Sequence, residues 1–289
     1  MNRSNTPNGS GFARVGKQHP CPICNKADWC GISRDGAFAI CMRMDCGAIR
    51  QTANGGYLHK LDSSLADSLQ LRHTIERCNR QQDDTSNWPT LAVTFQVQVK
   101  SDWLQRLSRE LGVSVKNLKR LGVGWSPRNR AWSFPMRHAA GQVCGIRLRN
   151  WAGRKWAIRG SRQGLFIPER FPQTLKRSRL FIAEGPTDTA ALLDMSFNAI
   201  GRPSCRGMER QIVQLAKQTA AAQVVIAADR DKPGRDGAAQ LAAILIQAGI
   251  ANQVFIPPPG EKDIRQWRQS GANASDVIRL LSSKSGGAL

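Results

Sequence analysis

The sequence is short of several residue types, and each shortage narrows what the protein can be. Its 289 residues include only 21 acidic residues, 4 His and 1 Tyr. No apolar run approaches the roughly 20 residues that cross a bilayer. The start of the chain is polar and rich in Gly and Asn, unlike a secretory signal. These shortages argue against a membrane or secreted protein, and we expect the chain in the cytoplasm.

Basic residues are abundant by contrast. Lys and Arg number 42, the formal net charge is +21, and the excess is spread along the whole chain. The sequence pI is about 10.7. A field of this sign favours a polyanionic partner such as a nucleic acid. Passive nucleic-acid-binding proteins share this composition, so the charge predicts a partner and not a reaction.

Five of the eight cysteines fall between Cys21 and Cys46. In a reducing compartment such clustering indicates metal ligation rather than disulfides. Cys21 and Cys24 form a Cys-x-x-Cys knuckle, whose tight turn places two thiolates on one tetrahedral ion. The other three cysteines are scattered and are interpreted as small buried side chains: Cys78, Cys144 and Cys205.

Two further ligands are expected on a β-hairpin that runs from Trp29 to Cys41. Asp35-Gly36 would form its two-residue turn. Counting outward from that turn pairs Cys30 with Cys41 on one face of the hairpin. Four thiolates leave no open coordination position, so we predict one structural zinc ion, held by Cys21, Cys24, Cys30 and Cys41. Cys46 is the alternative fourth ligand.

The composition divides the chain into five segments. A disordered tail is expected over 1–18 and a zinc ribbon over 19–60. A linker follows over 61–90, and its first part, Leu65 to Cys78, has the leucine spacing of a short helix. Residues 91–176 would form a small basic α+β subdomain. Residues 177–289 would form an α/β domain that ends in helices.

The basic subdomain is predicted to start with two helices and to continue as an antiparallel sheet. Leucines at helical spacing predict a helix that begins at Ser101, is capped by Asp102 and ends at Gly112. A second helix, from Ser114 to Leu121, is again capped by serine. Alternating apolar and polar residues then indicate strands over 131–136, 142–149 and 155–159.

The strands of this subdomain carry basic residues on one face, with Trp151 and Trp156 between them. A basic groove interleaved with aromatic rings suits a single-stranded nucleic acid. The alternative is an ordinary solvated face with the tryptophans in the core. The residues expected to contact nucleic acid are Arg128, Arg130, Arg147, Arg149 and Lys155.

From Ser178 to about Ser283, apolar runs alternate with helical segments. Strands that alternate with helices over short connections imply a mostly parallel sheet covered by helices. The strands are expected over 180–183, 198–200, 224–228 and 254–256, and the helices over 187–195, 208–218 and 236–248.

Acidic side chains follow two of these strands. Glu184 follows the strand over 180–183, and Asp229 and Asp231 follow the strand over 224–228. Ligands of open α/β sheets gather at the carboxyl ends of strands, so these carboxylates would converge if the two strands are neighbours. Convergent carboxylates need cations, and oxygen ligands select Mg²⁺ or Mn²⁺. The alternatives are an ordinary strand-end charge at Glu184 and a helix N-cap at Asp188.

The acidic motifs resemble those of the Toprim domain. Glu184-Gly185-x-x-Asp188 and Asp229-x-Asp231-x-x-Gly234 are similar to the two motifs that bacterial-type primases share with type IA and II topoisomerases and some nucleases. The order of zinc ribbon, basic subdomain and Toprim domain resembles the primases over about 19–270. The expected fold class is therefore α/β, with a Toprim-type mostly parallel sheet preceded by a small basic α+β subdomain and the zinc ribbon.

The resemblance also implies roles for the acidic residues. Glu184 would lie nearest the reacting phosphate, and Glu184, Asp229 and Asp231 would be the catalytic residues. Asp188 and Asp263 would join them in holding Mg²⁺ or Mn²⁺. The sequence departs from the family pattern at Arg265, where a second acid is often found, and in a ribbon without the histidine of the commonest primase pattern.

The implied function is that of a DNA primase, which synthesises short RNA primers on single-stranded DNA from ribonucleoside triphosphates by two-metal nucleotidyl transfer. We expect a monomer in a bacterial cell, encoded by the host, a plasmid or a phage, that works with a separate replicative helicase because no helicase domain follows. One alternative is a Toprim nuclease, which would be expected to lack the ribbon. Another is a non-catalytic single-strand-binding replication protein, whose acidic set would be broken. A topoisomerase would need a tyrosine nucleophile, and the only tyrosine, Tyr57, abuts the ribbon.

Overall fold

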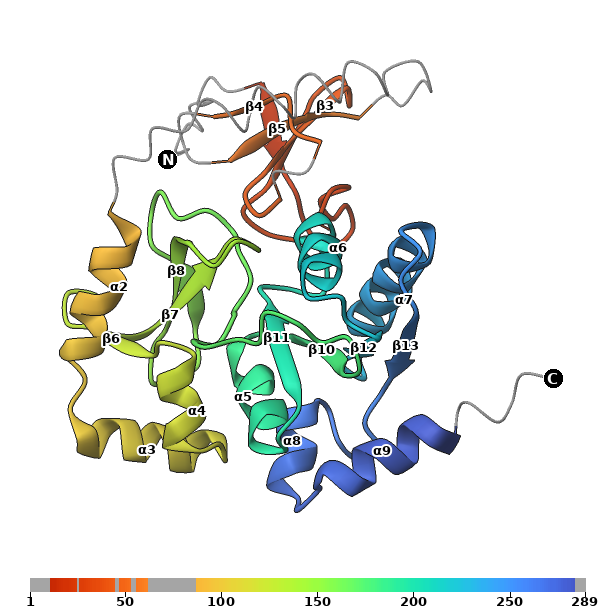
Figure 1. Ribbon diagram of the computed structural model, residues 1–289. Coiled ribbons are helices and arrows are strands. Elements are labelled where there is room, and N and C mark those ends of the chain that lie inside the picture. Colours follow the sequence, from red (N-terminus) through yellow and green to blue (C-terminus); the bar gives the residue numbers. More distant parts are fainter. Residues whose placement is uncertain (1–10, 25, 45–46, 53–55, 62–86, 284–289) are drawn as a thin grey trace. The chain divides into compact units, whose positions relative to one another are not determined.

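The computed structural model describes residues 11–24, 26–44, 47–52, 56–61 and 87–283 (Figure 1). The chain forms two compact units, residues 1–85 and residues 86–289, and each is considered by itself. The predicted helix from Leu65 to Cys78 and the alternative zinc ligand Cys46 lie outside the described residues. None of the described helices is long and apolar enough to span a membrane.

The first unit is a five-stranded antiparallel sheet with the order β1-β2-β3-β5-β4. The hairpin register is as predicted, because Gly31 lies opposite Ile40 and Ile32 opposite Ala39. The same register continued by one residue places Cys30 opposite Cys41. The strands are β1 (Phe12–Arg14), β2 (Gly31–Ser33), β3 (Phe38–Cys41), β4 (Arg50–Gln51) and β5 (Tyr57–Lys60).

Strand β1 lies within the segment that was expected to be a disordered tail. Phe12 to Arg14 pair antiparallel with β2, in the register Phe12 with Ser33 and Arg14 with Gly31. The expectation of disorder is therefore wrong for these residues. The polar composition of this segment did not indicate a strand. The strand forms because it pairs with a hairpin more than fifteen residues away in the sequence.

The second unit begins with three helices and a four-stranded antiparallel sheet, β6-β7-β8-β9. Helix α4 is capped by the Ser114 side chain, as predicted. Helix α3 begins at Ser101 as predicted, but its N-cap is Lys100, so Asp102 lies in the first turn instead of capping it. The elements are α2 (Trp88–Val97), α3 (Ser101–Leu111), α4 (Val115–Arg120), β6 (Gly124–Ser126), β7 (Ala131–Arg137), β8 (Val143–Arg149) and β9 (Lys155–Ala157).

The rest of this unit is an α/β domain around a four-stranded parallel sheet with the order β11-β10-β12-β13. The predicted alternation of strands and helices is confirmed, and with it the α/β fold class. The elements are β10 (Arg179–Glu184), α5 (Pro186–Asp194), β11 (Asn198–Arg202), α6 (Glu209–Gln218), β12 (Gln223–Ala227), α7 (Lys232–Gln247), β13 (Asn252–Phe255), α8 (Ile264–Gln269) and α9 (Ala274–Ser283).

The parallel sheet is buried on both faces, which is why its strands are almost continuously apolar. Phe181 and Ala183 of β10 face one core, together with helices α3, α4 and α5, whereas Leu180 and Ile182 face a second core with α6 and α7. Figure 1 shows α5 and α8 on the opposite side of this sheet from α6 and α7. The first core also contains residues of β7, so it crosses the predicted boundary between 176 and 177.

Candidate metal centres and basic surface

The four cysteines of the predicted zinc site lie together in the first unit. Their Sγ atoms are all within 4.8 Å of one another, and all four side chains are buried. The Sγ atoms of Cys24 and Cys30 are 3.7 Å apart, close to the roughly 3.8 Å that separates sulfurs around a tetrahedral ion with metal–sulfur bonds of about 2.3 Å. Backbone N–H groups of Met42 and Met44 donate to Cys30 and Cys41 at 3.4 and 3.2 Å. The arrangement therefore fits a structural zinc ion.

The thiols of this cluster perturb one another strongly. Hydrogen bonds with Cys21, Cys30 and Cys41 lower the pKa of Cys24. The pKa of Cys41 is raised, because its hydrogen bonds with Cys21, Cys24 and Cys30 favour its protonated form. The hydrogen bond with Cys24 raises the pKa of Cys21, but those with Cys30 and Cys41 outweigh it and lower this pKa to about 7. Such a cluster carries a thiolate readily, which favours a bound cation. The buried His59 is not part of the group, and its Nε2 lies 2.8 Å from the Met44 carbonyl oxygen.

The first acidic motif stands at the carboxyl end of strand β10. Glu184 is the last residue of the strand, and Gly185 follows with a φ of 90° as the N-cap of α5. This backbone conformation is one that L side chains rarely adopt, which explains the glycine in the Glu-Gly pair. The turn brings Asp188 into the first turn of α5, where it is buried.

The second acidic motif stands at the end of β12, directly beside β10 in the parallel sheet. Asp229 follows the strand, and Asp231 is the N-cap of α7, with its Oδ1 accepting from the Gly234 N–H at 2.8 Å. Helix α7 begins at Lys232, four residues earlier than predicted, because this cap starts it. A Cβ atom at Gly234 would lie 2.7 Å from the Asp229 carbonyl oxygen, so the motif requires glycine there.

The acidic side chains converge electrostatically. Burial, and then the charges of Asp188, Glu184, Asp263 and Asp231, raise the pKa of Asp229 to about 8. Burial and the charge of Asp263 raise the pKa of Asp188 to about 7, against the opposing effect of Arg265. Among the described residues, however, only the cysteines form a group whose ligand atoms all lie within 4.8 Å of one another. The carboxylates are therefore a looser cluster, whose chemistry suits hard divalent cations.

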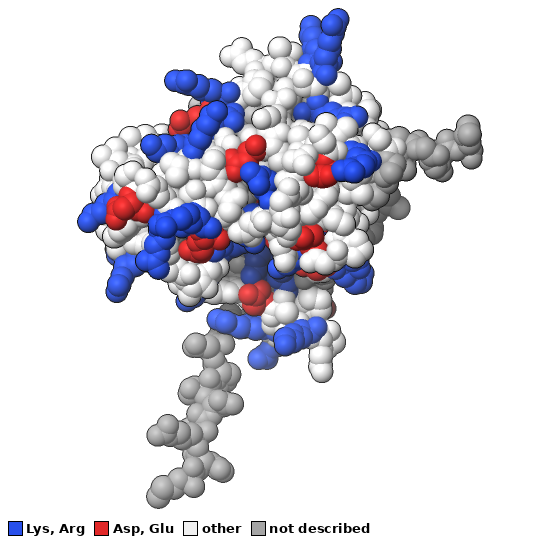
Figure 2. Space-filling view, turned by 90° about the horizontal axis from the view of Figure 1, so that it is seen from below, with Lys and Arg blue, Asp and Glu red and all other residues white. Residues whose placement is uncertain are grey.

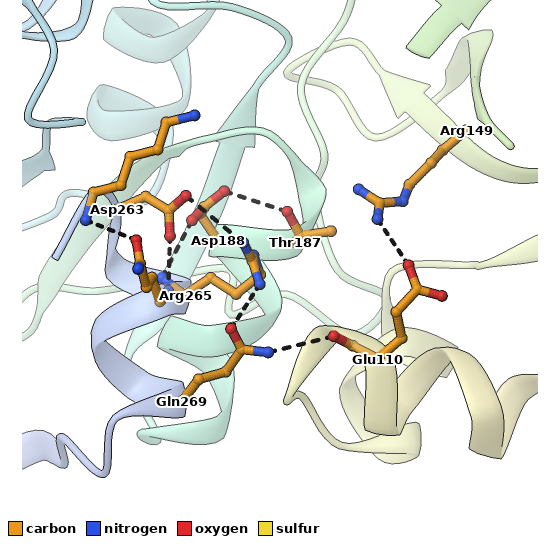
Figure 3. A network of polar contacts seen from close by, with 9 residues as sticks. Glu110, Arg149, Thr187, Asp188, Asp263, Arg265 and Gln269 are labelled. Atoms are coloured by element: carbon orange, nitrogen blue, oxygen red, sulfur yellow. Dashed lines mark hydrogen bonds and ion pairs between the residues drawn. The ribbon is translucent and has the colours of Figure 1, made fainter. Parts of the chain in front are cut away.

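A polar network joins this cluster to the helices around it. Figure 3 shows Asp188 on α5 and Asp263 at the start of α8, both close to Arg265. Asp263 caps α8 through its Oδ1, which accepts from the Gln266 N–H at 2.7 Å. The network continues from Arg265 to Gln269 at 2.9 Å and from Gln269 to the Glu110 carbonyl at 3.3 Å.

One charged residue near the site was missed from the sequence. Arg202 ends strand β11 directly opposite Glu184, and only 2% of it is exposed. Burial lowers the pKa of its guanidinium, and the charges of Glu184, Glu209 and Asp229 act in the opposite direction. Its position at the carboxyl end of a third predicted strand is the signal that could have found it.

The predicted basic residues fall into two groups. Arg147 and Arg149 point to one side of β8, as predicted, but each is engaged within the protein. Arg147 Nη2 donates to the Pro203 carbonyl at 2.8 Å, and Arg149 Nη2 donates to Glu110 Oε1 at 2.9 Å. The exposed members are Arg128, Arg130 and Lys155. Figure 2 shows Lys and Arg spread over the visible face and interrupted by acidic side chains.

The tryptophans of the basic subdomain are part of a core. The rings of Trp132 and Trp151 meet edge to face with centroids 5.2 Å apart, and Trp125 contacts both. The Arg106 guanidinium lies 4.6 Å from the centre of the Trp151 ring. For Trp151 the core interpretation therefore holds over the nucleic-acid one.

Comparisons with known proteins agree with this architecture. Residues 181–267 match the family described as Toprim-like. The Aquifex aeolicus primase structure, which contains zinc-binding and RNA polymerase domains, is similar with a TM-score of 0.54 and 15% identity, over 97% of this chain and 80% of that one. The E. coli primase catalytic core gives a TM-score of 0.52 and 17% identity, over 67% and 78%. A DnaG primase catalytic domain bound to single-stranded DNA gives the same four values.

No curated protein matches the sequence. At 15% to 17% identity, the solved structures share the fold of this chain. The chain has a primase-like fold with a Toprim-like domain and an N-terminal four-cysteine cluster. The resemblance to the bacterial-type primases is therefore confirmed for the fold.

Proposed function

We propose that this protein is a DNA primase, which makes short RNA primers on single-stranded DNA from ribonucleoside triphosphates. The observation that carries the proposal is the proximity of a basic strand to the acidic cluster. Lys155 of β9 lies opposite Arg149 in the neighbouring strand β8. The charge of Lys155 acts on the buried carboxylate of Asp188. A template strand and a triphosphate bound to the basic residues would therefore lie beside the carboxylates.

The protein's own groups would divide the work of nucleotidyl transfer. Glu184, Asp229 and Asp231 would hold Mg²⁺ or Mn²⁺, which when bound activates the 3′-hydroxyl and neutralises the leaving oxygens. Exposed basic side chains would bind and orient the phosphates of template and nucleotide. The cysteine cluster, with a zinc ion, would stabilise the first unit, which is too small to build a large core of its own.

Primer synthesis can be tested directly. Incubation with single-stranded DNA, the four ribonucleoside triphosphates and Mg²⁺ or Mn²⁺ should give short RNA products on a sequencing gel. Glu184→Gln and Asp229→Asn should each reduce product by at least about a hundredfold, because each amide keeps the side-chain shape but loses the charge that holds the ion. Asp102→Asn, a change of the same kind at an exposed position of α3, is the matched control and should leave synthesis intact.

The same experiment separates the alternatives. Labelled DNA that is shortened while no RNA forms would identify a nuclease that uses the same carboxylates. DNA binding without either reaction, over varied template sequences and with a replicative helicase added, would instead identify a non-catalytic binding protein. Binding of DNA by the two acidic-site variants should equal that of the wild type, since the carboxylates are not the groups that bind phosphate.

A further inference from the structure

The acidic cluster contains two kinds of carboxylate. Asp188 and Asp263 are 7% and 9% exposed, and each of their four carboxylate oxygens has a partner in the chain. Asp188 Oδ1 accepts from the Arg265 backbone N–H, and Oδ2 from the Thr187 hydroxyl, both at 3.3 Å. Asp263 Oδ1 accepts from the Gln266 N–H at 2.7 Å, and Oδ2 lies 3.8 Å from Arg265 Nη2.

Glu184, Asp229 and Asp231 are left open by comparison. Asp231 is exposed, and the other two are partly buried. Of their six carboxylate oxygens, Asp231 Oδ1 alone accepts a hydrogen bond within the described part of the chain, from Gly234. Their remaining oxygens are available to ligands from outside the chain. The cluster is therefore split into an occupied pair and an open triad.

Arg265 is the group that occupies the pair. Its backbone N–H binds Asp188, and its guanidinium faces Asp263, so one residue contacts both acids (Figure 3). The guanidinium is fixed from the other side, because Nη1 donates to Gln269 Oε1 at 2.9 Å. Gln269 in turn donates to the Glu110 carbonyl of α3 at 3.3 Å. The cation is thus held in place from two helices.

We propose that Arg265 is a built-in cation that takes the place of a divalent ion beside Asp188 and Asp263, so that Glu184, Asp229 and Asp231 alone hold the divalent ions of this protein. Two buried acids beside one another need a positive charge, which a guanidinium supplies permanently. Mg²⁺ demands nearly octahedral oxygen coordination, and a pair in which three oxygens already accept N–H or O–H donors and the fourth faces a guanidinium does not offer it. Arg265 is then a positioning residue, and Asp188 and Asp263 support the site without binding metal.

The number of bound ions tests the proposal. Mn²⁺ would be titrated into the full chain at pH 8, with free Mn²⁺ followed by electron paramagnetic resonance and heat by calorimetry. Asp263→Asn should bind as many ions as the wild type, with an affinity within about threefold, whereas Asp229→Asn should lose at least one ion. Arg265→Gln should gain one ion, and Arg265→Lys, which keeps the charge, should not. Arg268→Gln, the same change one turn along α8, is the control and should match the wild type.

Thermal unfolding supplies a second measurement. In EDTA at pH 8, Arg265→Gln should melt at a lower temperature than the wild type, because two buried carboxylates lose their cation. Mn²⁺ should then raise its melting temperature by more than it raises that of the wild type. If Arg265→Gln does not fold, the ion counts of Asp263→Asn and Arg265→Lys still decide. Loss of an ion in Asp263→Asn, gain of one in Arg265→Lys, or an unchanged count in a folded Arg265→Gln would overturn the proposal.

The inference rests on the proposed function only in that the open triad binds divalent ions. Ion counting does not involve primer synthesis, so the two proposals can fail separately. The expected counts in a protein that makes no RNA would refute the primase activity and leave the role of Arg265 in place. RNA synthesis in a protein whose Asp263→Asn variant loses an ion would do the reverse.

Discussion

The cysteine cluster and the acidic cluster are both candidate metal sites, but only the first is complete in the chain itself. Its four sulfurs are buried, lie within 4.8 Å of one another and come from the short stretch Cys21 to Cys41. The carboxylates are spread from Glu184 to Asp263, and in the part of the chain that the structure describes no three of them reach that spacing. A closed set suits an ion that stays, whereas an open set leaves room for phosphate oxygens. The difference leads us to expect a structural ion at the first site and a reactive one at the second.

The largest effect is expected at the cysteine cluster, which we call the closed site. Fresh protein should contain about one zinc per chain, and Cys30→Ser should release it and unfold the first unit, since zinc binding contributes on the order of 10 kcal/mol to the folding of small zinc domains. Elemental analysis measures the zinc, and limited proteolysis measures the unfolding. Cys46→Ser is the matched control and should keep the ion. Zinc lost from Cys46→Ser and retained in Cys30→Ser would give the fourth position to Cys46, and wild-type protein without zinc would rule out the site.

The acidic cluster, which we call the open site, should make the stability of the protein depend on pH when divalent ions are absent. Burial and neighbouring carboxylates raise the pKa of Asp229 from 3.8 to about 8. Between about pH 4 and pH 8 the folded state therefore keeps a proton that the unfolded chain has lost, and stability falls as pH rises through this window. The full pKa difference would correspond to about 6 kcal/mol. We expect a loss on the order of 2 kcal/mol, because Asp229 is partly open to solvent.

Urea unfolding in EDTA at pH 5 and pH 8 measures this loss. Asp229→Asn should remove its share of the loss and leave the part that comes from Asp188, whose pKa is raised to about 7. Mg²⁺ should restore stability at pH 8, because the ion replaces the proton as the neutralising charge. The closed site has no share in this effect if the zinc remains bound, which elemental analysis after EDTA treatment would establish. A free energy of unfolding that does not change between the two pH values would mean that neither burial nor the neighbouring carboxylates raise the pKa of Asp229 in the folded protein.

The closed site was predictable because its information is local. The Asp35-Gly36 turn fixes the hairpin register, and the register places Cys30 opposite Cys41 within a few residues of the knuckle. The alternation of strands and helices in the α/β domain was predictable for a similar reason, since the spacing of apolar residues within each segment indicates a strand or a helix. The glycines of both acidic motifs also follow from local geometry, a positive φ at Gly185 and a close approach at Gly234.

The features that the sequence did not predict depend on contacts between residues far apart in the chain. Helix α2 went unpredicted, because Trp88, Ala92 and Phe95 are buried against the sheet β6-β7-β8-β9, which lies later in the chain and supplies residues such as Ala131 and Ile146. The occupied state of Asp188 depends on Arg265, which lies 77 positions along the chain. Strand position and the family resemblance together placed five acids in one metal set, and only the partners of each oxygen divide that set into a pair and a triad.

The smallest effect concerns the basic residues. As with the carboxylates, a side chain that already has a partner within the chain is occupied, and one without such a partner is open. Arg149 is paired with Glu110, whereas Arg128 and Lys155 are exposed and have no side-chain partner among the described residues. Arg128→Ala combined with Lys155→Ala should reduce the slope of log binding constant against log salt by about 0.7 for each lost phosphate contact on single-stranded DNA. Lys116→Ala, an exposed lysine on α4, is the control and should leave the slope unchanged.

Arg149→Ala should behave differently from the exposed pair. Because its guanidinium is committed to Glu110, its removal should lower the free energy of unfolding by less than about 1 kcal/mol, as for other partly exposed ion pairs, and should change the salt slope little. Fluorescence anisotropy of a labelled oligonucleotide at four salt concentrations measures the slope, and urea unfolding measures the stability. If Arg149→Ala instead flattens the slope as much as the double variant does, the template displaces Glu110 when it binds. The charge at Arg149 would then belong with the open groups, and the Glu110 ion pair would be a contact that DNA must break.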